Sequence, residues 1–233
     1  MKAVILAGGL GTRLKPFTSA IPKPLLPVGE KAVMEIQIDL LRKHRFTNIF
    51  VATNYKSNYI ENFFKDGSRY GVNLHISKER RRLGTAGPLK LIEKELTEPF
   101  LVMNGDILTS ANLKRMYEFA VNTDTLLTIA IKKEITPFAF GNITFKGDYV
   151  THIEEKPDLT FFILAGIYVM KPEILKLIPS NRYYGMDQLI QYLLKKKIPI
   201  TKYEIKEYWL DIGRLSDYEK AQGVYKKHFK NKR

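Results

Sequence analysis

Short apolar segments and amphipathic segments alternate through the first half of this chain. Four apolar runs have the length of buried strands: 2–7, 48–53, 72–77 and 99–106. Three intervening segments space their apolar residues as amphipathic helices do: 32–44, 57–67 and 87–96. This alternation predicts parallel strands joined by helices that cover both faces of one sheet.

Strand patterns dominate the second half. Three segments are predicted as strands: 125–133, 140–156 and 161–170. Lys146-Gly147-Asp148 is predicted as a hairpin turn inside the second of them. Helical spacing returns at 186–197 and 215–229. We therefore expect an α/β fold with a mixed, mostly parallel central sheet, an antiparallel addition and a closing helix.

The sequence contains no linker, internal repeat or low-complexity segment. A length of 233 residues with 45% apolar content is enough for one sizeable core. We predict a single domain over 1–233, with halves at 1–124 and 125–233.

Several classes of protein are disfavoured by composition. The chain has no cysteine, which fits a reducing cytoplasm and removes disulfides and thiolate chemistry. The N-terminus lacks the apolar stretch of a signal peptide, and the longest apolar run, 161–170, is too short to span a bilayer. We expect a cytoplasmic protein without membrane insertion.

The net charge of +14 indicates an anionic partner or a basic, solvated surface. Nucleic acid, an anionic membrane and phosphorylated small molecules are the candidate partners. The basic clusters 78–82, 195–197 and 226–233 are separated and carry few of the interleaved aromatic residues that single-strand binders use. The first cluster, "KERRR", stands directly before a glycine motif.

A glycine loop follows the first apolar run, in the stretch "ILAGGLGTRLKPFTSAIPKPLLPVG" at 5–29. It is no dinucleotide fingerprint, because Leu14 occupies the place of the third glycine, and it does not match a P-loop. Glycines nevertheless let backbone N–H groups approach an anion closely. Arg13 adds a planar fork for phosphate oxygens, and Lys23 adds a charge held between two prolines. The loop therefore predicts a phosphate site.

Further motifs occur in a recognisable order along the chain: "LGTAGPL" (83–89), "VMNGDIL" (102–108), "IEEKP" (153–157), "LAGIYVM" (164–170) and "YWLDIG" (208–213). Together with the glycine loop they resemble the sugar-1-phosphate nucleotidylyltransferases. The resemblance implies a Rossmann-like three-layer α/β/α fold of the GT-A-like type. It also implies a reaction in which a sugar 1-phosphate attacks the α-phosphorus of a nucleoside triphosphate, releasing pyrophosphate and an NDP-sugar for cell-surface glycans.

The resemblance assigns roles to individual residues. The nucleotide-binding residues, in the half 1–124, would be Leu6, Ala7, Gly8, Gly9, Gly11, Thr12, Arg13, Gly84 and Thr85. Catalysis would use Arg13, Lys23 and Asp106, with Mg²⁺ held by Asp106 and Asp211. The sugar phosphate, in the half 125–233, would contact Gly141, Glu155, Lys156, Ala165 and Gly166. Asp106 also follows an apolar strand, where open α/β sheets bind their ligands.

Several alternatives stay open at this point. The motifs are most similar to the branch of mannose-, heptose- and glucosamine-1-phosphate guanylyltransferases, which favours GTP. A uridylyl- or thymidylyltransferase on a hexose or amino-sugar 1-phosphate is the nearest alternative. A non-catalytic sugar-nucleotide sensor and a basic nucleic-acid-binding domain are others, although we expect no nucleic-acid partner. The resemblance also allows a homodimer, and it leaves Arg80, Arg81 and Arg82 either near the triphosphate or on an exposed loop.

Overall fold

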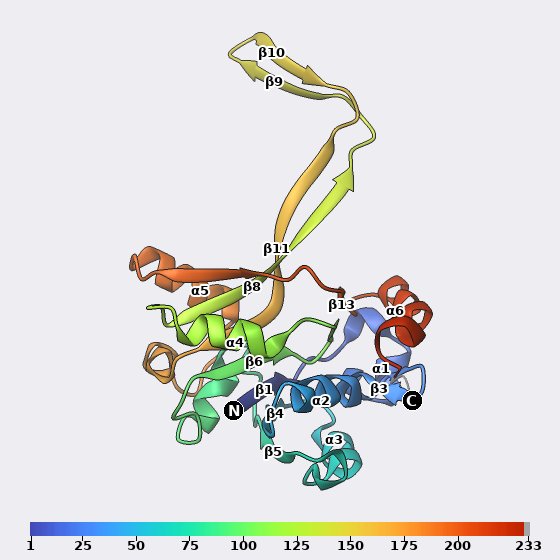
Figure 1. Cartoon of the computed structure of the whole chain (residues 1–233), viewed down its shortest axis with the longest axis vertical. Coiled ribbons are helices and arrows are strands. Elements are labelled where there is room, and N and C mark those ends of the chain that lie inside the picture. Colours follow the sequence, from blue (N-terminus) through green and yellow to red (C-terminus); the bar gives the residue numbers. More distant parts are fainter. Residues whose placement is uncertain (231–233) are drawn as a thin grey trace.

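A computed structural model describes residues 1–230 and contains one seven-stranded sheet (Figure 1). Its strands, in chain order, are β1 (Lys2–Leu6), β4 (Asn48–Thr53), β5 (Asn73–Lys78), β6 (Phe100–Asn104), β8 (Leu127–Pro137), β11 (Asp158–Met170) and β12 (Ile200–Glu204). Their spatial order is β12-β8-β11-β6-β1-β4-β5. Neighbours are parallel except that β11 runs antiparallel to both β6 and β8. The predicted mixed, mostly parallel sheet is confirmed.

Six α-helices accompany the strands in the described residues: α1 (Phe17–Ala20), α2 (Val33–Lys43), α3 (Ser57–Phe64), α4 (Leu113–Val121), α5 (Met186–Lys195) and α6 (Leu215–His228). Five 3-10 helices join them: η1 (Thr12–Leu14), η2 (Lys23–Leu25), η3 (Ser68–Tyr70), η4 (Gly87–Ile92) and η5 (Pro172–Leu177). Segment 87–96 was predicted as an amphipathic helix, but only its start is helical, as η4, with Pro88 in its first turn. The sequence patterns also missed α4 and β12.

Side chains that alternate along the strands fill two cores, one on each face of the sheet. On one face, Ile5 packs in a cluster with Met34 and Ile38 of α2. On the other, Val4 packs in a cluster with Leu89 of η4 and Leu189 of α5. Helices therefore cover both faces, as the three-layer α/β/α prediction requires.

A third cluster fixes the loop that follows β1. Leu14 and Leu26 of this loop pack with Tyr225 of α6. The Tyr218 hydroxyl and the Gln222 side-chain amide of α6 both donate to the carbonyl of Pro27, each at 2.6 Å. The loop is thus held between the sheet and α6. It also contains the short pair β2 (Pro27–Val28) and β3 (Lys31–Ala32).

Strands β8 and β11 continue far beyond the sheet as a two-stranded ribbon (Figure 1). Only Leu127–Ile131 of β8 pairs with β12, and only Ile167–Met170 of β11 pairs with β6. At the far end, β9 (Asn142–Lys146) and β10 (Tyr149–Glu154) form a hairpin closed by Gly147-Asp148, where a turn was predicted. We call residues 132–164 the arm. The predicted antiparallel addition is therefore a projection and not a cover for the sheet.

Among the described residues, no helix combines the length and the apolar character needed to cross a membrane.

Candidate functional site

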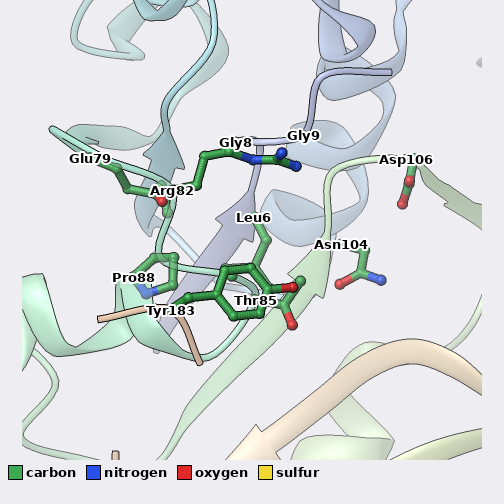
Figure 2. Close-up of a pocket in the computed structure, with 12 residues that line it drawn as sticks. Leu6, Gly8, Gly9, Glu79, Arg82, Thr85, Pro88, Asn104, Asp106 and Tyr183 are labelled. Carbon is green, nitrogen blue, oxygen red and sulfur yellow. The ribbon is translucent and has the colours of Figure 1, made fainter. Parts of the chain in front are cut away.

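A cleft of about 210 Å³ opens where β1 and β6 end (Figure 2). Figure 2 shows Glu79 and Arg82 on one side of this cleft and Asn104 and Asp106 on the other. Its lining residues are Leu6, Gly8, Gly9, Ala52, Glu79, Arg82, Gly84, Thr85, Pro88, Asn104, Asp106 and Tyr183. The cleft lies at the carboxyl ends of parallel strands, where open α/β sheets bind ligands.

The structure brings most of the predicted nucleotide-binding residues to this cleft. Five of them line it: Leu6, Gly8, Gly9, Gly84 and Thr85. Ala7 is buried beneath the loop, where its N–H donates to the carbonyl of Ala52 at 2.7 Å. Gly11, Thr12 and Arg13 follow in the same loop but are not among the residues that line the cleft. The Thr85 hydroxyl accepts a hydrogen bond from the Met186 N–H at 2.7 Å, so this loop also fixes the start of α5.

Glu79 is a cleft residue that sequence reasoning missed. Its Oε2 accepts from the Leu83 N–H at 2.9 Å, and a Cβ at Gly8 would lie 2.6 Å from its Oε1. Only 9% of Glu79 is exposed. Burial raises the pKa of its carboxyl, while the Leu83 hydrogen bond and the charge of Arg82 act against that shift. An acid inside the basic run "KERRR" was the signal that could have revealed it.

The arginines of that run are all exposed, but they are not equivalent. Arg82 lines the cleft, and Figure 2 shows its side chain extending toward Gly8 and Gly9. Arg80 and Arg81 are not among the lining residues. A positive charge therefore lies beside the glycine loop, in addition to those of Arg13 and Lys23.

Asp106 lies at the centre of the predicted catalytic group. The Lys23 Nζ is 2.6 Å from Asp106 Oδ2, which joins the glycine loop to the end of β6. The other carboxylate oxygen, Oδ1, is buried and has no hydrogen-bond partner within residues 1–230. An unpaired buried anionic oxygen is costly unless a cation or donor satisfies it.

Asp211 faces the same place from a second element. Strand β13 (Trp209–Asp211) pairs antiparallel with β7 (Ile107–Thr109), so that Asp211 lies opposite Ile107. Removal from water and then the negative charge of Asp106 raise the pKa of the Asp211 carboxyl to about 6, against the opposing charges of Lys23 and Arg13. Asp211 nevertheless remains exposed to solvent. The two aspartates predicted as metal ligands are therefore brought together.

This pair fits a hard divalent cation. Such ions bind oxygen ligands, and the unpartnered Oδ1 of Asp106 together with the crowded Asp211 carboxylate offers two. Within residues 1–230 there is no group of three or more acidic or histidine side chains that could hold a metal. A cation here would complete its shell with water and substrate oxygens, which is the usual arrangement for Mg²⁺.

Gln37 holds the backbone around Asp106 in place, and it was not identified from the sequence. This α2 residue is 1% exposed, and its Nε2 donates to the carbonyls of Asn104 and Ile107 at 2.9 and 2.8 Å. It thereby fixes the backbone on both sides of Asp106. A lone amide on the apolar face of the predicted helix 32–44 was the available signal.

The predicted sugar-phosphate residues fall into two separate groups. Ala165 and Gly166 lie beside the cleft: a Cβ at Gly166 (φ +66°) would be 2.7 Å from Asn104 Nδ2, and Trp209 Nε1 donates to the Ala165 carbonyl at 2.8 Å. Gly141, Glu155 and Lys156 lie on the arm instead, between its ribbon and its hairpin (Figure 1). In this structure they are not brought together with Asp106.

Comparison with known proteins agrees with this geometry. A family model described as "Nucleotidyl transferase" matches residues 2–228. The chain is 33% identical to a UTP–glucose-1-phosphate uridylyltransferase of Synechocystis and 34% identical to a mannose-1-phosphate guanyltransferase of Pichia angusta. These matches cover 99% and 97% of the chain but only 65% and 64% of the two relatives.

Solved structures match the fold over nearly their whole length. A putative glucose-1-phosphate thymidylyltransferase from Bacillus anthracis has a TM-score of 0.81 at 25% identity, covering 100% of this chain and 98% of that one. HddC from Yersinia pseudotuberculosis complexed with GMP-PN has a TM-score of 0.76 at 27% identity, covering 96% and 99%. With a family model spanning almost every described residue and relatives above 30% identity, the chain belongs to the nucleotidyl transferase family.

Proposed function

We propose that this protein is a sugar-1-phosphate nucleotidylyltransferase. A phosphate oxygen of the sugar 1-phosphate would form a bond to the α-phosphorus of a nucleoside triphosphate. The bond from that phosphorus to the bridging oxygen would break, and pyrophosphate would leave with the electron pair. The observation that carries the proposal is the junction at Asp106, where Lys23 of the glycine loop lies 2.6 Å from one carboxylate oxygen and the other has no partner.

The reaction needs charge neutralisation more than it needs a nucleophile from the protein. Two polyanions must approach each other, so positioning and preorganised positive charge supply most of the catalysis. Arg13, Lys23 and Arg82 are the positive charges near the cleft that would act on the triphosphate. Asp106 and Asp211 would hold Mg²⁺, which supplies further positive charge when bound.

For the nucleotide we propose GTP. Guanine presents an amino group next to its ring N–H, whereas uracil and thymine lack that amino donor. Glu79 is a buried acceptor in the cleft, and only one of its carboxylate oxygens is engaged with Leu83. Similarity to mannose-1-phosphate guanyltransferases supports this choice, and similarity to the uridylyltransferase makes UTP the alternative.

The excess positive charge suits two phosphorylated substrates, and we propose these as the partners in place of nucleic acid. The cysteine-free sequence supports a reducing cytoplasm as the place of action.

The proposal is tested by a matrix of nucleoside triphosphates against hexose, heptose and amino-sugar 1-phosphates with Mg²⁺, followed by pyrophosphate release. Turnover with GTP and at least one sugar 1-phosphate is expected. Turnover with UTP or dTTP alone would support the proposed reaction but contradict GTP as the nucleotide. Tight nucleotide binding with no turnover for any pair would instead identify a sensor.

A further inference from the structure

The arm carries an apolar face that nothing covers. In its hairpin, Phe145 pairs with Val150 and Ile143 pairs with Ile153. Phe145 and Ile143 alternate along β9, and a bulge between Val150 and His152 keeps their two partners in β10 on the same face. They are between 50% and 73% exposed. Within residues 1–230 the arm contributes eleven of the 21 exposed large hydrophobic side chains.

Such a surface needs a protein partner. A lone two-stranded hairpin is marginally stable in water, and a contiguous exposed apolar patch marks an interaction site. Four lysines and five carboxylates give the arm a net charge of −1, which leaves +15 on the rest of the chain. The arm is thus ill suited to nucleic acid or an anionic membrane, whereas the basic body of another copy complements it.

The cleft lacks groups for binding a sugar 1-phosphate, and the arm carries such groups. This step rests on the proposed function, because a sugar 1-phosphate brings a second phosphate beside Asp106. The charges that act at Asp211 come from Lys23 and Arg13 of the glycine loop, on the triphosphate side. The enclosed volume of about 210 Å³ is also smaller than that of pockets that hold a ligand of nucleotide size, which begin near 300 Å³.

The missing groups are gathered where the ribbon meets the hairpin. A Cβ at Gly141 would lie 3.1 Å from Glu155 Oε2, and Lys156 next to it has a positive φ of 49° at a sharp bend. We call Gly141, Glu155 and Lys156 the elbow. Gly166 beside the cleft lies eight positions after Asp158 in β11, so at about 3.3 Å per residue the elbow is roughly 25 Å from its own site.

We propose that two copies of this chain exchange arms, so that the elbow of each completes the sugar-phosphate side of the other's cleft. Glu155 of the partner subunit would accept hydrogen bonds from sugar hydroxyls, and Lys156 of the partner subunit would neutralise the sugar phosphate. The apolar face of the hairpin is covered in the same contact. A two-fold arrangement makes the exchange reciprocal, which closes the assembly at a dimer.

Complementation between two defective chains tests the exchange. Asp106→Asn removes the centre of the cleft and keeps the arm, whereas Lys156→Ala removes the elbow cation and keeps the cleft. The two chains are co-expressed with different tags, and the heterodimer is purified through both. One of its two sites then combines an intact cleft with an intact elbow, so pyrophosphate release of about half the wild-type rate is expected. A heterodimer as inactive as its parents overturns the proposal.

A crosslinking experiment separates this proposal from the proposed function, because it does not depend on turnover. The chain has no cysteine, so Lys156→Cys in one chain and Tyr183→Cys in another place single thiols at the elbow and at the rim of the cleft. A short bis-maleimide is expected to join the two chains, and Lys94→Cys in place of the Tyr183 variant is expected to give no product. Crosslinking within one Lys156→Cys/Tyr183→Cys chain, with no joined chains, overturns the exchange.

The apolar face gives a matched pair of variants. Phe145→Glu places a charge on the uncovered face, and Thr144→Glu places the same charge on the opposite one. Sedimentation is expected to show a dimer for wild type and Thr144→Glu and a shift toward monomer for Phe145→Glu. A wild-type protein that stays monomeric at all concentrations, or variants that behave alike, would contradict the proposal.

Discussion

The glycine loop and the elbow are both predicted to bind phosphate, but they are built in opposite ways. The loop is fixed by a buried cluster under α6 and by the ion pair between Lys23 and Asp106. The elbow is carried on two strands that leave the sheet, with exposed side chains on either side of it. One half of the proposed chemistry therefore belongs to the rigid body, and the other half depends on where the arm is docked.

The largest expected effect is on the rigid side. Asp106→Asn should lower the rate of pyrophosphate release by at least about 100-fold, because the carboxylate that pairs with Lys23 and faces Asp211 is lost. The matched change Asp148→Asn in the arm turn should leave the rate nearly unchanged. Steady-state kinetics of both variants measure this, and near-normal activity of Asp106→Asn would show that the site lies elsewhere.

Removing the hairpin tests the other side. Residues 138–157 can be replaced by Asn-Gly, because Pro137 and Asp158 are already paired across the ribbon. The melting temperature should change by only a few degrees, since the cores of the body are untouched. Saturation by sugar 1-phosphate should be lost while calorimetry still detects nucleotide binding. Loss of nucleotide binding as well would show that the glycine loop does not bind the nucleotide independently of the hairpin.

A smaller effect is expected at Gln37, which belongs wholly to the body. Gln37→Leu leaves the carbonyls of Asn104 and Ile107 without their donor and should destabilise the fold by about 1–3 kcal/mol. The exposed Gln191→Leu should cost less than about 0.5 kcal/mol. Denaturant unfolding checks both values. Equal values would mean that the two hydrogen bonds contribute little.

The smallest effect is a dependence on pH at Glu79. Because folding raises its pKa, the unfolded chain loses this proton at a lower pH than the folded one. Stability should therefore fall as pH rises from the ordinary value of a glutamate through the raised value, and Glu79→Gln should lack this decline. Melting temperatures of both proteins between about pH 4 and pH 7 test the prediction. If the melting temperature of the wild type instead rose with pH relative to that of Glu79→Gln, the surroundings of Glu79 would be stabilising its carboxylate.

The sequence predicted the sheet well because its information is local. Apolar runs ending at Gly8 and Gly105, with helices at 32–44 and 57–67, specify β/α units whatever lies around them. Asp106 and Lys23 could be placed in one catalytic group because a resemblance to a known family linked distant motifs. The structure brings their side chains to 2.6 Å, an ion pair that the sequence did not predict, and the catalytic roles stay predictions.

What could not be predicted depends on tertiary context. Glu79 sits in a run of basic residues that has the composition of a solvated loop, and only the fold shows that it is buried against Gly8. Segment 87–96 has helical spacing, yet only its first part is helical and the rest forms turns. The arm projects because only part of β8 pairs with β12 and only part of β11 pairs with β6. No local sequence pattern contains the extent of this pairing.

The contact between α6 and the glycine loop affects the order in which the protein folds during synthesis. Tyr218 donates to the carbonyl of Pro27, a partner 191 positions earlier in the chain. A contact of such separation closes late, because the intervening chain must be ordered first. During synthesis the phosphate loop is thus among the first parts to leave the ribosome and among the last to take its final shape. A nascent chain stalled before residue 215 should fold its β1–β4–β5 sheet and still fail to hold a nucleotide.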